Sequence, residues 1–292
     1  VNLIIVPFRA PKSTQLYRRL WTEKGSPLLL HLNDLTEKLQ QCSGPETDFF
    51  GAMRYGNPPL RKVLDEVLEK NYDQVVLLPL YPQHASSTTG SVVEAAMKQI
   101  GSLQAMPSLR TIGKFYDHPA FVDAFAKRIN AYQPEKFDHI LFSYHGLPNR
   151  QINKIHPQVT VENCNCENEM PPHGRLCYRA QCYATTRLLA TKLKLLPEQY
   201  STAFQSRLSK NWMTPFADET IANLAEKGVS KLLVVAPSFV ADCLETTVEI
   251  GFEYRELFEN AGGEKLQLVE SLNSADVWVE AVMEILGEGV RR

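Results

Sequence analysis

Two long stretches of the chain show the same alternation of apolar and amphipathic segments. From Phe49, the pattern predicts a strand, a proline-containing turn, an amphipathic helix and a wholly apolar strand over Val75 to Leu80. From Thr202 the same order recurs, and it ends on an apolar strand over Leu232 to Ala236. Strands that are apolar throughout and alternate with helices are typical of parallel sheets covered on both faces. The pattern therefore predicts an α/β fold built from two similar halves.

The segments around these stretches complete a picture of two lobes. Val1 to Phe8 and Leu28 to Leu32 fit more than one kind of element, whereas helices are predicted over Asp34 to Gln41, Pro119 to Tyr132, Ala184 to Leu195, Asp242 to Phe258 and Asp276 to Leu286. We place one Rossmann-like lobe at residues 1–135 and the other at residues 136–292, each a parallel sheet flanked by helices. No low-complexity linker separates them, so we expect close packing with an active-site cleft between the lobes.

Composition narrows the class of protein. A chain of 292 residues that is 44% hydrophobic can bury the cores of two lobes. A formal net charge of -2 gives no reason to expect a nucleic-acid partner. No run approaches the roughly 20 apolar residues of a membrane span, and no signal peptide opens the chain. We therefore expect a cytoplasmic protein.

One histidine stands where a buried strand ends. The apolar run Ile140 to Phe142 stops at Ser143, and His145 lies beside Gly146 and Pro148, which both interrupt regular structure. In open α/β folds, the carboxyl ends of the strands are where sites form. His145 is therefore the best candidate for a catalytic base, and the alternative is a histidine that only holds the loop through hydrogen bonds.

Three glutamates follow the last apolar strand at a regular interval. Glu245, Glu249 and Glu253 are spaced at i, i+4 and i+8 of a predicted helix, with Asp242 one turn earlier. Like charges at this spacing repel, so such a column is stable only if it is solvated, partly protonated or occupied by cations. A solvated acidic face remains the alternative to a functional column.

Four of the six cysteines lie close together in the predicted insertion at residues 151–182, where periodicity is weak. Thiols stay reduced in the cytoplasm, so this group favours a metal over disulfides. The intervals between the four thiols fit either tetrahedral zinc or a two-iron cluster, although the C-x2-C pairs usual for zinc are absent. Free thiols are a third alternative, and His173 is a further candidate ligand. Cys42 and Cys243 lie elsewhere and have no apparent metal partner. The four grouped cysteines are Cys164, Cys166, Cys177 and Cys182.

Five motifs in order along the chain are similar to those of one enzyme family. They are YRRLW from Tyr17, YPQHASSTTGS from Tyr81, SYHGLP from Ser143, FQSRLSKNW from Phe204 and PSFVADCLETTVEI from Pro237. Together they resemble the ferrochelatases, especially the bacterial type. The resemblance implies a lyase that inserts Fe2+ into protoporphyrin IX to form protohaem, the last step of haem biosynthesis. It also implies a [2Fe-2S] cluster on the four grouped cysteines, and a first strand that residues 1–135 lack.

The resemblance assigns roles to individual residues. His145 would accept one pyrrole proton, since an imidazole has a reference pKa near 6.5, and Glu245 would take the other. Both would lie next to the incoming iron, with Glu249, Glu253 and Asp242 as a proton or metal relay. Arg18 or Arg19 would bind a propionate, and the mixture of basic and apolar residues there also suits peripheral contact with the inner face of a membrane. The residues matched to porphyrin binding are Arg18, Arg19, Tyr55, Tyr81, Ser87, Thr88, Trp212 and Phe239.

Two other functions remain open from the sequence. The first is a chelatase for a different tetrapyrrole, such as coproporphyrin III or a cobalt-corrin precursor, which the propionate-binding side chains would distinguish. The second is a non-catalytic iron-sulfur binding or sensor protein with two lobes. That protein would not need His145 or Glu245. The sequence makes no prediction of the oligomeric state.

Overall fold

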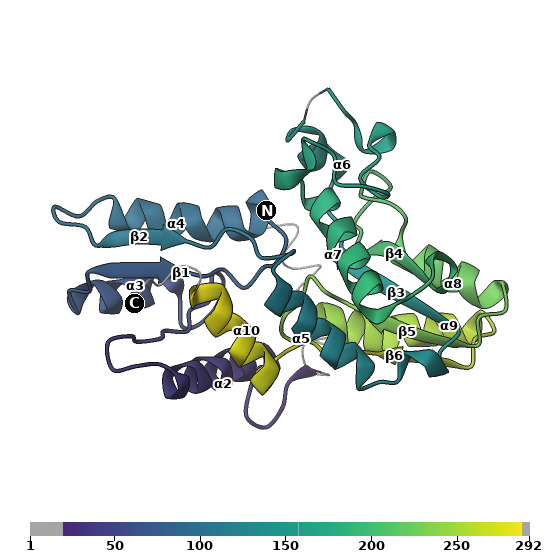
Figure 1. Cartoon of the computed structure of the whole chain (residues 1–292), viewed down its shortest axis with the longest axis horizontal. Helices are drawn as coiled ribbons and strands as arrows, with labels where there is room; N and C mark the ends of the chain where they lie inside the picture. The colour runs from purple at the N-terminus through teal and green to yellow at the C-terminus, as the bar shows by residue number, and fades with distance from the viewer. Residues whose placement is uncertain (1–19, 157, 288–292) are drawn as a thin grey trace, which may run out of the picture.

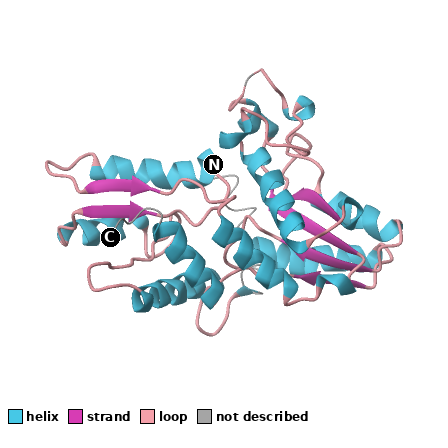
Figure 2. Ribbon diagram, in the orientation of Figure 1, coloured by secondary structure: helices cyan, strands magenta, loops and turns pink. Residues whose placement is uncertain are grey.

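The computed structural model describes residues 20–156 and 158–287, which form two separate sheets with helices around them (Figures 1 and 2). The elements of the first half are α2 (Pro27–Cys42), α3 (Leu60–Glu69), β1 (Gln74–Leu77), the π turn η1 (Ser86–Gly90), α4 (Ser91–Ile100), β2 (Ser108–Thr111) and α5 (Pro119–Asn130). Those of the second half are β3 (His139–His145), α6 (Asn149–Asn153), α7 (Tyr178–Leu193), β4 (Tyr200–Gln205), α8 (Ala217–Glu226), β5 (Lys231–Val235), the π-helix η6 (Glu245–Tyr254), α9 (Arg255–Asn260), β6 (Lys265–Leu268) and α10 (Asp276–Gly287). Short 3-10 turns connect several of them.

Both sheets are parallel throughout. β1 pairs with β2, and the second sheet has the order β4-β3-β5-β6. The central strands β3 and β5 are buried along almost their whole length, as expected for a sheet with helices on both faces. The predicted α/β class with helix-flanked parallel sheets is therefore confirmed.

The two halves are less alike than the repeated pattern predicts. No strand forms from Phe49, where only a single bridge joins Met53 to Pro59. Pro58 and Pro59 have no N–H group to donate to a sheet, which explains why this segment does not extend the two-stranded sheet. The prediction of a strand at this point was wrong, and the first described sheet has half as many strands as the second.

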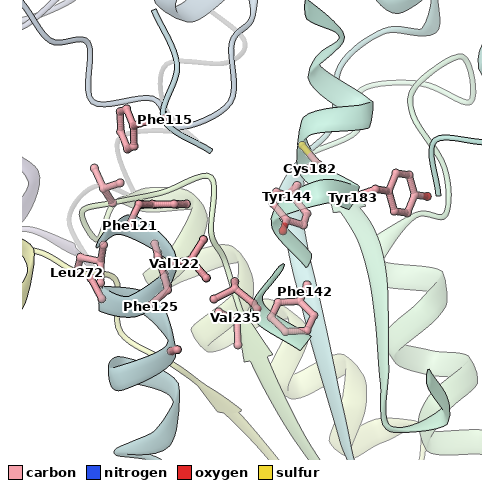
Figure 3. Packing of buried hydrophobic residues seen from close by; sticks show 14 of the residues in the cluster. Phe115, Phe121, Val122, Phe125, Phe142, Tyr144, Cys182, Tyr183, Val235 and Leu272 are labelled. Carbon is pink, nitrogen blue, oxygen red and sulfur yellow. The ribbon is translucent and has the colours of Figure 1, made fainter. Parts of the chain in front are cut away.

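A continuous apolar core passes between the two sheets. Phe121 and Phe125 of α5 belong to this core together with Phe142 of β3 and Trp278 of α10, and Figure 3 shows the α5 side chains beside Leu272. Helix α10 packs on α5 and on α2, so the last described helix returns to the first half (Figure 1). The lobe boundaries at residues 135 and 136 stay a prediction.

Several helices differ from the predicted ones. The segment from Leu28 is helical, because α2 begins at Pro27, and α7 begins at Tyr178, six positions before the predicted start. The segment predicted as one α-helix from Asp242 is instead a ten-residue π-helix that continues into α9. π-Helices are rare and frequently occur at functional sites. The segment Val1 to Phe8 lies outside the described residues.

Candidate active site

His145 is the last residue of β3 and is only partly buried, unlike the strand before it. Its Nδ1 lies 2.7 Å from the carbonyl oxygen of Gly146. Because a carbonyl only accepts, the neutral ring carries its proton on Nδ1 and leaves the Nε2 lone pair open. The hydroxyl of Tyr178 donates to the His145 carbonyl oxygen at 2.8 Å, and the His145 N–H lies 3.3 Å from Ser238 Oγ. The ring is thus positioned with a basic nitrogen available.

Two aromatic side chains predicted to line the porphyrin site lie beside this histidine. The ring centroids of Trp212 and Phe239 are 6.4 and 6.3 Å from that of His145. Trp212 is held there by backbone pairing, since Met213 N–H donates to Leu147 oxygen at 2.9 Å. A Cβ on Gly146 would come within 3.0 Å of the Gln205 carbonyl oxygen, so only glycine permits this close approach.

Glu245 is the first residue of η6, and it is joined to the histidine strand through Gln205. Gln205 is the register partner of His145 in the β3–β4 pair, and its carbonyl accepts from Gly146 N–H at 2.8 Å. Its side-chain Nε2 donates to the Glu245 carbonyl oxygen at 2.9 Å. The structure therefore brings His145 and Glu245 to the same end of the sheet, although their catalytic roles stay predictions.

The acidic column runs from the interior to the surface. Glu245 and Glu249 are partly buried, whereas Glu253 is exposed. The Asp242 carboxylate has different neighbours: it accepts from Thr246 Oγ1 at 3.0 Å and from Asn273 Nδ2 at 2.8 Å. These contacts fasten the start of the π-helix to the segment before α10.

Tyr81 of the first half lies within electrostatic range of the start of η6. Burial raises the pKa of Tyr81, the neighbouring Tyr55 raises it further, and Arg54 opposes the effect. Cys243 and Glu245 also raise the pKa of this phenol, as weaker influences. Tyr55 is 70% exposed and has the Arg54 guanidinium 4.6 Å from its ring centroid.

The remaining porphyrin candidates are placed less directly. Ser87 and Thr88 lie on the π turn η1, just before α4. The loop before η1 is bonded to α7, because Gln181 Oε1 accepts from His84 N–H at 2.6 Å. Arg18 and Arg19 lie outside the described residues.

The four grouped cysteines come together at the start of α7, and all are free thiols. Cys166, Cys177 and Cys182 are fully buried, and the fourth, Cys164, is within electrostatic range of Cys166 and Cys177. Burial raises the pKa of Cys166 to about 12 and also raises the pKa of Cys177 and Cys182.

Two histidines and one arginine surround these thiols. His156 Nε2 lies 3.3 Å from Cys177 Sγ, and His173 Nε2 lies 3.3 Å from Cys164 Sγ. The buried Arg179 guanidinium donates to Cys166 Sγ at 2.8 Å. Within residues 20–156 and 158–287, however, no three histidine, cysteine or acidic side chains are already arranged to hold a metal ion. The donors are grouped, but not in a coordination geometry.

Sequence reasoning did not single out several residues of these two sites. Gln205 and Ser206 lie in the FQSRLSKNW motif, and a polar pair at the end of a strand is a signal that could have identified them. Tyr178 and Arg179 had no such signal, because the start of α7 was assigned to the non-periodic insertion.

Within the described part of the chain, none of the helices has both the length and the apolar content needed to cross a bilayer.

Comparison with known proteins gives consistent matches. The sequence model of the ferrochelatase family matches residues 1–289. A ferrochelatase of Legionella pneumophila (strain Lens) is 42% identical over 294 residues, which cover 99% of this chain and 86% of the relative. A ferrochelatase of Coxiella burnetii (strain Dugway 5J108-111) is 38% identical and covers 98% of this chain and 80% of the relative.

Solved structures of other proteins share the fold. SirB from Bacillus subtilis with Fe3+ superposes with a TM-score of 0.60 at 12% identity, over 90% of this chain and 91% of SirB. CbiX, the terminal enzyme for biosynthesis of siroheme in denitrifying bacteria, gives a TM-score of 0.54 at 13% identity, over 91% of this chain and 95% of CbiX. At these identities the likeness shows the chelatase fold alone.

Proposed function

Because the chain belongs to the ferrochelatase family and acts in haem biosynthesis, we propose that it is a lyase that inserts Fe2+ into protoporphyrin IX. The observation that carries this proposal is the placement of a histidine with an open Nε2 and a partly buried glutamate at one end of the same sheet. Gln205 contacts the backbone next to both of them. Two proton acceptors fixed in this way can take two protons from one flat ligand.

The two side chains have different tasks in this reaction. Metal insertion replaces two pyrrole protons by one divalent ion, so two acceptors are needed. His145 accepts one proton at Nε2, because its Nδ1 already donates to Gly146. Glu245 accepts or passes on the other, and the exposed Glu253 lies where protons or iron exchange with solvent. Glu249 and Asp242 complete the acidic face of this route.

Aromatic and polar side chains from both halves would hold the macrocycle. Trp212 and Phe239 supply rigid rings next to His145 on one side. Tyr81, which is within electrostatic range of both Tyr55 and Glu245, would supply a further ring from the first half. Ser87 and Thr88 add hydroxyl groups, and Arg18 or Arg19 would pair with a propionate.

Anaerobic absorbance spectroscopy tests the reaction and its substrate. Protoporphyrin IX with Fe2+ should lose its free-base bands and gain those of haem when the protein is added. Coproporphyrin III serves as the comparison substrate, and faster conversion of coproporphyrin would reassign the porphyrin without changing the reaction class. No conversion of either porphyrin would favour the binding or sensor function instead.

We also propose that Cys164, Cys166, Cys177 and Cys182 hold a [2Fe-2S] cluster. Such a cluster supplies a redox-active anionic centre when it is bound. The support is the chemistry of the donors: three fully buried thiols, a fourth nearby, and a buried cation that donates to sulfur. A buried guanidinium needs a negative partner, and cluster thiolates provide one. His156 and His173 are the alternative ligands if a cysteine is spared.

Replacing Cys177 with serine is expected to remove the visible chromophore of the purified protein, because one of the four sulfur ligands is lost. Iron and acid-labile sulfide per chain should fall together with the absorbance. Cys42→Ser is the matched control, since Cys42 is exposed and lies outside the group. A Cys177→Ser protein with the full chromophore would exclude Cys177 as a ligand.

Replacing Arg179 with methionine distinguishes a bound iron-sulfur cluster from four free thiols. If the thiols are neutral, replacing the buried guanidinium by an apolar side chain of similar length should leave the free energy of unfolding unchanged or raise it. If they hold an anionic cluster, the cluster content should fall, because its buried counter-charge is gone. The control is Arg175→Met, where the side chain is exposed in the same segment.

Contact with a membrane surface is a further part of the proposal. Trp21 is 57% exposed and Leu208 is 65% exposed. Apolar side chains of this kind next to basic ones suit peripheral binding at the inner face of the cytoplasmic membrane. Sedimentation with anionic vesicles, with Trp21→Ser as the comparison, tests it.

A further inference from the structure

One carboxylate of the acidic column differs from its neighbours in its hydrogen bonds. Glu249 Oε1 accepts from Ser206 N–H and from the Tyr254 hydroxyl, both at 2.8 Å. Glu249 Oε2 accepts from Ser206 Oγ at 2.5 Å and from Gln205 Nε2 at 3.1 Å. A carboxylate has about four lone-pair positions, and here four donors occupy them. Metal coordination by Glu249 would therefore have to displace at least one of these donors.

The donors are held in place by the fold itself. Ser206 directly follows β4 and has a φ of 62°, a left-handed conformation that is uncommon for residues other than glycine. This turn directs both its N–H and its hydroxyl at the same carboxylate. Tyr254 is buried, and burial, followed by the charge of Glu249, raises the pKa of its phenol, which therefore stays a donor. Strain of this kind persists only where the surroundings fix it.

The same group of residues connects the strand that ends at His145 with the backbone of Glu245. Ser143, two positions before His145, donates its hydroxyl to Gln205 Oε1 at 2.7 Å. Gln205 Nε2 then donates both to Glu249 and to the backbone oxygen of Glu245. Ser143 and Gln205 are fully buried, so a broken bond in this chain would leave an unpaired polar group in the interior.

We infer that Glu249 is a positioning residue: it clasps the π-helix to the end of β4 and so fixes Glu245 at the end of the sheet where His145 lies. The clasp consists of Glu249, Gln205, Ser206 and Tyr254. This inference rests on the proposed function, because it assumes that His145 and Glu245 react with the porphyrin. It changes the role of one member of the column, because four donors hold the Glu249 carboxylate in place whereas Glu253 is exposed.

Steady-state kinetics with Fe2+ as the varied substrate test the inference. The variants are Glu249→Gln, which turns an acceptor into a donor, and Ser206→Ala and Tyr254→Phe, which each remove one donor and leave every carboxylate intact. We expect all three to lower kcat by between about tenfold and a hundredfold, the scale for small misplacement of reacting groups. The KM for Fe2+ should stay within about twofold of wild type, because no iron ligand is lost.

Other outcomes would overturn the clasp without affecting the proposed reaction. A raised KM for Fe2+ in Glu249→Gln, with Ser206→Ala and Tyr254→Phe like wild type, would make Glu249 an iron contact. Unchanged kcat in all three variants would also overturn it. Glu256→Gln, an exposed carboxylate on α9, is the control for charge alone. If Glu249→Gln does not fold, the two donor variants decide, and an active His145→Ala protein would count against the proposed function instead.

Discussion

Replacing His145 with alanine is expected to reduce haem formation by at least about a hundredfold, the usual contribution of a positioned general base. The reason is geometric: the ring has its Nδ1–H directed at the Gly146 carbonyl and its Nε2 open beside Trp212 and Phe239. Alanine leaves the backbone bonds at this strand end in place, including that from Tyr178 to the His145 oxygen. Porphyrin binding, measured by fluorescence quenching, should therefore be retained.

His139→Gln is the matched control for this variant. His139 lies at the other end of the same strand, and its Nε2 is 2.9 Å from Ser201 Oγ. A glutamine amide can keep a bond to that hydroxyl, so turnover should stay within about twofold of wild type. A His145→Ala protein with more than about a tenth of the wild-type rate would remove the assignment of His145 as the base.

The fold class followed from the sequence because buried parallel strands have a strong pattern. Val75 to Leu80 and Leu232 to Ala236 consist of apolar residues, and β1 and β5 each begin one residue before such a run and end inside it. The strand expected from Phe49 failed because the pattern of apolar residues did not account for the missing N–H groups of Pro58 and Pro59. Local periodicity predicts which face is buried, but not whether a neighbouring strand can pair.

The spacing of residues along the chain did not predict the π-helix, for a different reason. The i, i+4 spacing of Glu245 and Glu249 puts them on nearly one face in either an α-helix or a π-helix, so the pattern predicts the shared face correctly and the backbone incorrectly. The hydrogen bonds that fix this helix are tertiary, because the Gln205 and Ser206 donors bond to two of its residues. These partners lie about 40 positions away, where no local signal reaches.

The candidate site was predictable as residue types but not as an arrangement. His145, Trp212 and Phe239 come from three separate motifs, and only the pairing of β3 with β4 and β5 puts them within ring contact. For Arg179, by contrast, the sequence did not indicate even that the residue belongs to a site. A single arginine in a cysteine-rich segment resembles a surface residue, and its burial against Cys166 depends on where α7 begins.

Replacing Glu245 with glutamine is expected to cause a loss comparable to that of His145→Ala, about a hundredfold or more in kcat. Glutamine has nearly the same shape, and the bond from Gln205 goes to the backbone oxygen, which this change does not touch. What is lost is a partly buried proton acceptor. Glu259→Gln, an exposed carboxylate on α9, should keep the wild-type rate.

The double variant His145→Ala with Glu245→Gln decides whether the two side chains act in the same event. Groups that act as a unit are strongly non-additive, so the double variant should be little slower than the slower single variant. If the losses multiply instead, the two protons leave in independent steps. In that case the shared attachment through Gln205 would position two separate acceptors, and kcat of Glu245→Gln above about a tenth of wild type would remove Glu245 from the reaction altogether.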